Sequence, residues 1–212
     1  MERESYKIAI TLLVFDLLFV ILDYAGIGFF AYSGGMLAAR KSLDPFGAAI
    51  VGAVTGMGGG TLRDVLLGAL PVYWIAEPSY LGVGLAGALL GYFTSPWAQS
   101  LASRRIVLNW ADAVGLSVFC VLGAQAGLAA GAHWSIALLT GVMSAAFGGL
   151  IRDIIVNDVP LVLKEDIYAL AALAGAGAYV AGLSMGLPAE WVTLGAATLA
   201  LVLRGCAIVF KW

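Results

Sequence analysis

Two short segments place an arginine next to an aspartate inside long apolar stretches. The first reads GMGGGTLRDVLLGALP over residues 56–71, and the second reads AFGGLIRDIIVNDVP over residues 146–160. A bare charge at the centre of an apolar span costs at least about 2.5 to 3.5 kcal/mol by insertion scales, so each charged group needs a partner or water. Ionisable residues in such positions are typical of a path for ions or polar solutes.

The rest of the chain offers few groups for enzymatic chemistry. His133 is the single histidine, and the two cysteines, Cys120 and Cys206, both fall within apolar runs. The sequence holds no HExxH motif and no phosphate-binding loop, and Ser144 has no candidate base. We therefore expect no enzymatic activity, no cofactor, no disulfide framework and no metal site.

The composition is that of a membrane protein. Of the 212 residues, 62% are hydrophobic and 11% are charged, and the mean hydropathy is +0.98. An ordinary soluble domain is about one quarter charged. The net charge of −2 provides no basic stripe for nucleic acid, so the composition predicts an integral membrane protein without a nucleic-acid partner.

Seven apolar windows are long enough to cross a bilayer as helices, which needs about 20 residues each. The chain is therefore expected to form an all-α membrane protein with seven transmembrane helices. The windows fall near residues 10–38, 46–70, 79–95, 106–130, 133–157, 165–187 and 189–210.

The basic residues predict the orientation of these spans. An odd number of crossings places the termini on opposite faces, and most basic residues then share the C-terminal face, where the positive-inside tendency expects the cytoplasm. The N-terminus is accordingly expected outside. The C-terminal face carries Arg40, Lys41, Arg104, Arg105, Lys164, Arg204 and Lys211, whereas the N-terminal tail carries Arg3 and Lys7.

The two charged segments belong to an internal duplication. An offset of 89 residues carries Arg63 to Arg152 and Asp23 to Asp112 without a gap. Within the single membrane domain of residues 1–212, we expect repeat 1 at 10–95, repeat 2 at 99–187 and a seventh helix at 189–210. Because each repeat has three crossings, the second copy is expected upside down relative to the first.

Inverted repeats are typical of transporters and channels, whose shared site lies near the midplane where interrupted helices meet. The glycines of both segments predict such interruptions, because each mid-helix glycine costs about 1 kcal/mol relative to alanine. The freed backbone groups would have to face protein, water or ions. The expected breaks comprise Gly58, Gly59 and Gly60 in the first copy and Phe147, Gly148 and Gly149 in the second.

After each break we expect a new helix to begin. Thr61 is placed to cap it, and Asp64 and Asp153 are placed to complement the helix dipole. Four acids, two in each copy, are available as partners for the two arginines, and the sequence does not decide which pairs with which. They are Asp23, Asp64, Asp112 and Asp153. Under the alternative interpretation, arginine and aspartate merely close a structural kink.

The stretch GGGTLRDVLLGALPVYW together with FGGLIRDIIVNDVPLVL resembles the prokaryotic branch of the trimeric intracellular cation (TRIC) channel family, over essentially the whole chain. The same duplicated domain is also described as a bacterial glycine transporter domain. The resemblance implies a homotrimer in a prokaryotic plasma membrane. Each subunit would have its own pore for K⁺ or Na⁺, bounded by the second and fifth helices.

By this resemblance, the kink glycines are those named above, and the basic residues that line the pore are Arg63 and Arg152. Arginines should repel a permeant cation. Either Asp64 and Asp153 neutralise them, or bared carbonyls coordinate the ion, or the arginines bind an anion such as an amino-acid carboxylate.

The sequence therefore leaves more than one function open. A monovalent cation channel is the leading hypothesis, and a secondary carrier for glycine or a similar small solute is the alternative, because a midplane arginine suits a carboxylate. A packing or assembly protein, which would pass neither solute, is the third.

Overall fold

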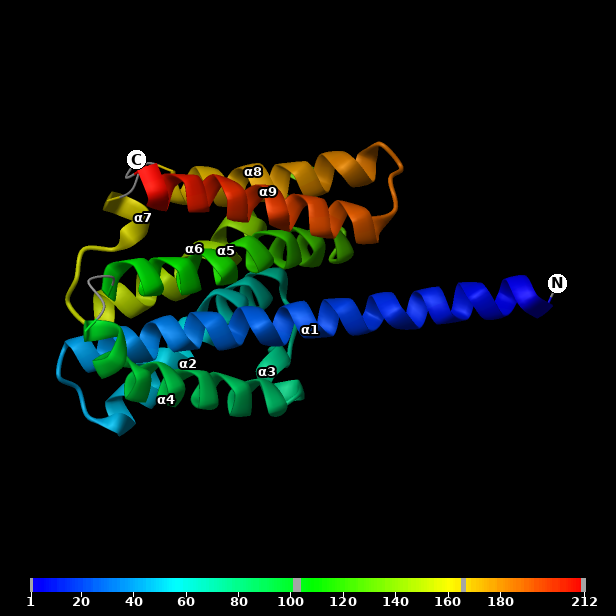
Figure 1. The fold of residues 1–212 in the computed structure, drawn as a ribbon. Helices are drawn as coiled ribbons and strands as arrows, with labels where there is room; N and C mark the ends of the chain where they lie inside the picture. The colour runs from blue at the N-terminus through cyan, green and yellow to red at the C-terminus, as the bar shows by residue number, and fades with distance from the viewer. Residues whose placement is uncertain (1, 101–103, 165–166, 211–212) are drawn as a thin grey trace.

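The computed structural model describes residues 2–100, 104–164 and 167–210, and the described part of the chain is all helical (Figure 1). Side chains are described for residue 17, residues 19–95, 106–164 and 167–210. The helices are α1 (Glu2–Arg40), α2 (Pro45–Leu67), α3 (Tyr73–Ala76), α4 (Ser79–Ser100), α5 (Arg104–Ala129), α6 (Trp134–Ile155), α7 (Leu161–Lys164), α8 (Tyr168–Ser184) and α9 (Ala189–Phe210).

Every apolar window predicted from the sequence overlaps one long helix, which confirms the all-helical prediction. Among the described residues, four segments are long and apolar enough to cross a membrane. They are Phe19–Arg40, Ile106–Ala129, Trp134–Ile155 and Ala189–Phe210. Seven crossings therefore remain a prediction. Arg3, Lys7, Arg104, Arg105 and Lys211, which helped to predict the orientation, lie outside the residues with described side chains.

The ends of α2 follow from local chemistry. Asp44 precedes the helix in an extended conformation and accepts a hydrogen bond from the amide of Gly47, and Pro45 occupies the first turn. Both residues are favoured there, because a carboxylate satisfies a free N–H and proline has none to satisfy. The helix stops at Gly68, which adopts a left-handed φ of 69°.

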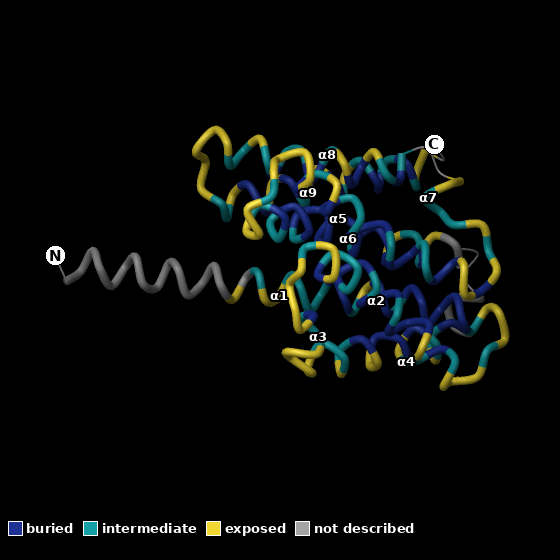
Figure 2. Tube along the Cα trace, turned by 180° about the vertical axis from the view of Figure 1, so that it is seen from behind, coloured by how far each residue is buried: buried dark blue, intermediate teal, exposed yellow. Residues whose placement is uncertain are grey.

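The long helices pack in two groups of three. Helices α1, α2 and α4 contact one another, and so do α5, α6 and α8. The groups meet through α1 against α5 and α2 against α6, and α9 packs on α5 and α8 (Figure 1). The most deeply buried residues lie where these helices face one another (Figure 2). Phe30 of α1 and Phe119 of α5, which are 89 positions apart, stack with ring centroids 5.6 Å apart.

The predicted helix breaks are wrong. Helix α2 runs through Gly58, Gly59 and Gly60, and α6 runs through Phe147, Gly148 and Gly149, without interruption. Carbonyl groups inside a continuous helix accept hydrogen bonds from the amides four residues on. They are therefore not bared for an ion.

The glycines serve close packing instead. A Cβ atom on Gly59 would collide with the carbonyl oxygen of Ser144, and one on Gly148 would collide with the carbonyl oxygen of Thr55, both well under 3.0 Å. Glycine therefore lets the backbones of α2 and α6 touch, which offsets its low helix propensity. As the position rises from 55 to 59 on α2, its partner falls from 148 to 144 on α6, so the two helices cross antiparallel.

Candidate functional site

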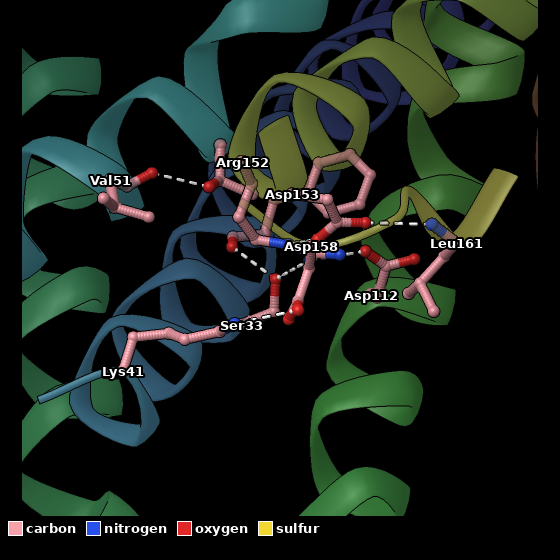
Figure 3. A network of polar contacts seen from close by, with 10 residues as sticks. Ser33, Lys41, Val51, Asp112, Arg152, Asp153, Asp158 and Leu161 are labelled. Atoms are coloured by element: carbon pink, nitrogen blue, oxygen red, sulfur yellow. Dashed lines mark hydrogen bonds and ion pairs between the residues drawn. The ribbon is translucent and has the colours of Figure 1, made fainter. Parts of the chain in front are cut away.

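Arg152 is the centre of a buried charged cluster at the C-terminal end of α6 (Figure 3). Its side chain has no exposed surface. The guanidinium donates from Nε to Asp153 Oδ1 and from Nη1 to Asp112 Oδ1, each at 2.8 Å. Two carboxylates from two helices thus face one buried arginine, which removes much of the cost of burying its charge.

A third helix joins this cluster through Ser33 of α1. Arg152 Nη1 also donates to Ser33 Oγ at 2.8 Å, and the Ser33 hydroxyl donates to the carbonyl of Phe30 at 2.7 Å. On the other side, Asp153 Oδ2 accepts the amide of Leu161, the first residue of α7, at 2.9 Å. The cluster therefore fixes α1, α5, α6 and the start of α7 relative to one another.

Arg63 forms the corresponding cluster near the end of α2. Its Nε and Nη2 atoms donate to Asp64 Oδ1 at 2.8 and 2.6 Å. Asp64 Oδ2 accepts the amide of Tyr73 at the start of α3, at 3.0 Å, as Asp153 does for α7. Arg63 keeps 13% of its side-chain surface exposed, so this cluster is more open to solvent than the Arg152 cluster.

Aromatic and polar side chains surround the Arg63 cluster. The guanidinium carbon of Arg63 lies 5.8 Å from the centre of the Tyr73 ring, a cation–π distance. Asp23 accepts a hydrogen bond from the hydroxyl of Tyr80 and lies within electrostatic reach of Arg63. The sequence predicted Asp23 and Asp112 as charge partners, and the structure pairs Asp112 with Arg152 directly.

The roles predicted for Thr61, Asp64 and Asp153 at helix N-termini are wrong. Thr61 lies inside α2, where its hydroxyl donates to the carbonyl of Met57 at 2.7 Å and accepts Trp74 Nε1 at 2.9 Å. Asp64 and Asp153 lie in the last turns of α2 and α6, where the helix dipole disfavours negative charge. The neighbouring arginines and the amides of α3 and α7 stabilise the two carboxylates there.

Two glycines of the motif make room for these clusters. A Cβ atom on Gly149 would lie 3.2 Å from Tyr168 Oη, 3.3 Å from Asp112 Oδ1 and 3.5 Å from Arg152 Nη2. Gly60 is packed against the ring of Tyr73 in the same way. These two glycines therefore lie against side chains of the charged clusters.

Tyr168 and Arg204 were not expected near this site. Tyr168 of α8 is buried, and the guanidinium carbon of Arg204 in α9 lies 4.8 Å from the centre of its ring. Arg204 is itself fully buried. A lone arginine inside the last apolar run was the one sequence signal that could have drawn attention to this contact.

A polar cavity of about 260 Å³ reaches the Arg152 cluster from the end of the bundle where α7 lies. Buried Arg152 and Asp153 belong to its lining, together with exposed or half-buried charges. The lining residues are Leu37, Arg40, Lys41, Leu108, Asn109, Arg152, Asp153, Asp158, Val159, Leu161 and Lys164. Within the described residues, no group of three His, Cys, Asp or Glu side chains is placed to hold a metal ion.

The chain matches a family model described as "Glycine transporter" twice, over residues 20–96 and 109–184. Among curated relatives, the UPF0126 membrane protein of Vibrio cholerae is 36% identical over 200 residues, covering 92% of this chain and 80% of that protein. The UPF0126 inner membrane protein YadS of Escherichia coli is 34% identical over 192 residues, covering 90% and 91%.

Solved structures of similar fold carry a different description. The TRIC trimeric intracellular cation channel orthologue from Rhodobacter sphaeroides superposes with a TM-score of 0.86 at 40% identity, covering 92% of this chain and 99% of that one. A prokaryotic TRIC channel in 0.5 M KCl gives a TM-score of 0.86 at 30% identity, covering 92% and 98%.

Proposed function

This chain belongs to the TRIC channel family, and we propose that it is a cation channel. The matches to the glycine transporter model and to the UPF0126 relatives support the same family assignment. It is an integral membrane protein, in keeping with its relatives' names and its apolar helices. The solved relatives are named for channel activity, which favours a channel over an enzyme.

The arrangement of the two charged clusters about the α2–α6 crossing carries this proposal. The glycine contacts centre the crossing near residues 57 and 146, and each arginine lies six residues beyond it toward its own helix end. At 1.5 Å per residue, Arg63 and Arg152 lie about 9 Å to either side of the crossing. We place the crossing at the bilayer midplane, so both arginines fall within a hydrocarbon core about 30 Å thick.

We propose that the two groups of helices are inverted repeats, at residues 10–95 and 99–187, within one domain of seven crossings. Reciprocal contacts support a two-fold relation, because Gly59 meets Ser144 while Gly148, its equivalent, meets Thr55. The stacking of Phe30 on its own equivalent, Phe119, supports it as well. The antiparallel crossing of α2 and α6 supports the inversion, and α9 is then the additional seventh helix.

The pathway we propose lies in each subunit along α2 and α6, between the Arg63 and Arg152 clusters, and conducts monovalent K⁺ or Na⁺. Its residues are those of the two motifs: Gly58, Gly59, Gly60, Thr61, Arg63, Asp64, Phe147, Gly148, Gly149, Arg152 and Asp153. In the Arg63 cluster, Asp64 and Asp23 outnumber the single guanidinium, which favours a cation. The assembly proposed is a homotrimer with its N-terminus outside and its C-terminus in the cytoplasm.

Single-channel recording from reconstituted protein tests this function. In a KCl gradient, currents should reverse near the K⁺ equilibrium potential. Arg63→Gln should increase K⁺ conductance by about fivefold at most, because a unit charge 4 Å from the ion contributes about 1 kcal/mol in water. Glu190→Gln, in the first turn of α9, is the control. Bilayers that stay silent at high protein load would contradict the proposal.

The alternative is a secondary carrier for glycine, which the description of the family model favours. The sequence suggests a carrier because midplane arginines and helix N-termini could bind a carboxylate. However, α2 and α6 have no internal N-termini, and Asp153 and Asp112 already pair with Arg152. Saturable counterflow of labelled glycine without unitary currents would favour the carrier.

A further inference from the structure

An ion pair lies at the end of the bundle from which the cavity reaches the Arg152 cluster. Lys41 Nζ donates to Asp158 Oδ1 at 2.8 Å, and the two side chains are 35% and 40% exposed (Figure 3). Lys41 follows the end of α1, and Asp158 lies between α6 and α7. The pair therefore joins the first helical group to the second across 117 residues of sequence.

Both turns that present this pair have a defined conformation. Ser42, directly after Lys41, has φ 57°, and Asn157, directly before Asp158, has φ 56°. Left-handed backbone outside glycine is uncommon, and it persists where surrounding structure fixes it. The amide of Asp158 also donates to the carbonyl of Asp153 at 2.8 Å. A movement of Asp158 is thus linked by one hydrogen bond to the backbone of the Arg152 cluster.

Among the residues that the structure describes, this pair has no counterpart at the other end of the proposed pathway. The 89-residue offset relates Asp158 to Ala69 and Lys41 to Ala130, so neither partner has a charged equivalent in the other copy. Because the Arg–Asp motif itself is repeated, this difference distinguishes the two ends of an otherwise similar arrangement.

Lys41 and Asp158 both line the 260 Å³ cavity that ends at Arg152 and Asp153. The exposed members of the lining meet water, whereas Arg152 has no exposed surface. The cavity is therefore open to solvent at its exposed charges and closed at its inner end, where Arg152 lies. We call this cavity the vestibule. Separating the two turns would widen it from outside toward the buried arginine.

We propose that Lys41 and Asp158 form a latch that holds this vestibule closed and so limits ion entry from the C-terminal face. The inference rests on the proposed channel function and adds a gate to it. An exposed ion pair contributes between about 0 and 1 kcal/mol. Loss of the latch should therefore shift the balance between closed and open vestibule by up to about fivefold.

Charge reversal distinguishes a latch from a simple local charge. Lys41→Gln and Asp158→Asn should both increase open probability, because either one breaks the pair. The double variant K41D/D158K should return it toward wild type. Lys164→Gln removes the same charge from the same cavity lining and leaves the pair intact, so it should reproduce none of this common increase. If the two single variants change the current in opposite directions, or leave it unchanged, the latch is wrong.

A second readout does not depend on conduction. Asn109, a half-buried residue of the vestibule lining, is replaced by cysteine in a Cys206→Ser background, while buried Cys120 is retained. The rate of labelling by N-ethylmaleimide, a neutral reagent, should rise about two- to fivefold in either single variant and fall back in the double variant. That pattern from a protein without unitary currents would support the latch and refute the channel. Equal labelling rates in all variants would overturn the latch.

Discussion

Gly59 of α2 lies directly against the carbonyl oxygen of Ser144 in α6, with no room for a Cβ atom between them. The same relation recurs between Gly148 and the carbonyl oxygen of Thr55. The two contacts are equivalent, because the 89-residue offset relates Gly59 to Gly148 and Thr55 to Ser144. The two contacts bring the backbones of the helices that carry Arg63 and Arg152 together at one crossing. The close approach of the two helices that carry the charged clusters therefore depends on glycine at both positions.

We expect Gly59→Ala to destabilise the protein by about 1 to 3 kcal/mol, because the added methyl group must push the α2 and α6 backbones apart. Gly148→Ala should have a similar effect. Thermal unfolding in detergent measures the change. Gly82→Ala in α4, where a Cβ atom would meet nothing within 4 Å, is the matched control and should leave stability unchanged or slightly higher. Equal stability of Gly59→Ala and Gly82→Ala would contradict the packing role.

The positions of the helices and of the two charged motifs could be predicted from the sequence. Apolar windows long enough for a bilayer are an intrinsic property of the chain, and so is the 89-residue offset that relates Arg63–Asp64 to Arg152–Asp153. The cost of a bare intramembrane charge required partners for the arginines, and Asp112 is such a partner. These conclusions needed no knowledge of which helix packs against which.

The helix breaks predicted at the glycines are absent from α2 and α6, because glycine has two uses that look alike in sequence. It permits a helix break, and it also permits a close helix crossing. Which use applies depends on whether a backbone such as that of Ser144 lies opposite, and this is tertiary information. For the same reason, Ser33 and Tyr168 could not be assigned to the Arg152 cluster from sequence.

Arg152→Gln should be strongly destabilising. It would leave the carboxylates of Asp112 and Asp153 buried without their cation, and breaking a buried pair in this way costs about 3 to 5 kcal/mol. Arg63→Gln should cost less, because Arg63 keeps 13% of its surface exposed and water can replace part of its interaction. Denaturant titration of the two variants in detergent compares them, and an equal loss in both would contradict the difference in burial.

Ser33→Ala tests the link between α1 and the Arg152 cluster. The hydroxyl accepts a charge-assisted hydrogen bond from Arg152 Nη1, and such bonds contribute about 1.5 to 3 kcal/mol. Ser117→Ala is the matched control, because Ser117 is also buried and its hydroxyl donates to the carbonyl of Val114 in its own helix, at 2.8 Å. Thermal unfolding should separate the two variants, and a Ser117→Ala loss as large as that of Ser33→Ala would argue against the link.

The Lys41–Asp158 pair predicts a defined dependence on pH. The hydrogen bond from the Lys41 ammonium holds the pKa of Asp158 below its ordinary value of 3.8, with Arg40 and Lys164 acting in the same direction and partial burial opposing them. Because the folded-state pKa is depressed, the pair stabilises the protein above the unfolded-state pKa, and this contribution is lost as pH falls through the folded-state pKa.

The difference in melting temperature between wild type and Asp158→Asn should therefore stay constant from neutral pH down to about pH 4 and shrink below it. The Asp158 carboxylate and the Lys41 ammonium form one ion pair. Since both side chains are more than a third exposed, the difference should also decrease at high salt. A difference that disappears already above about pH 5 would mean that the carboxylate is not held by Lys41 in solution.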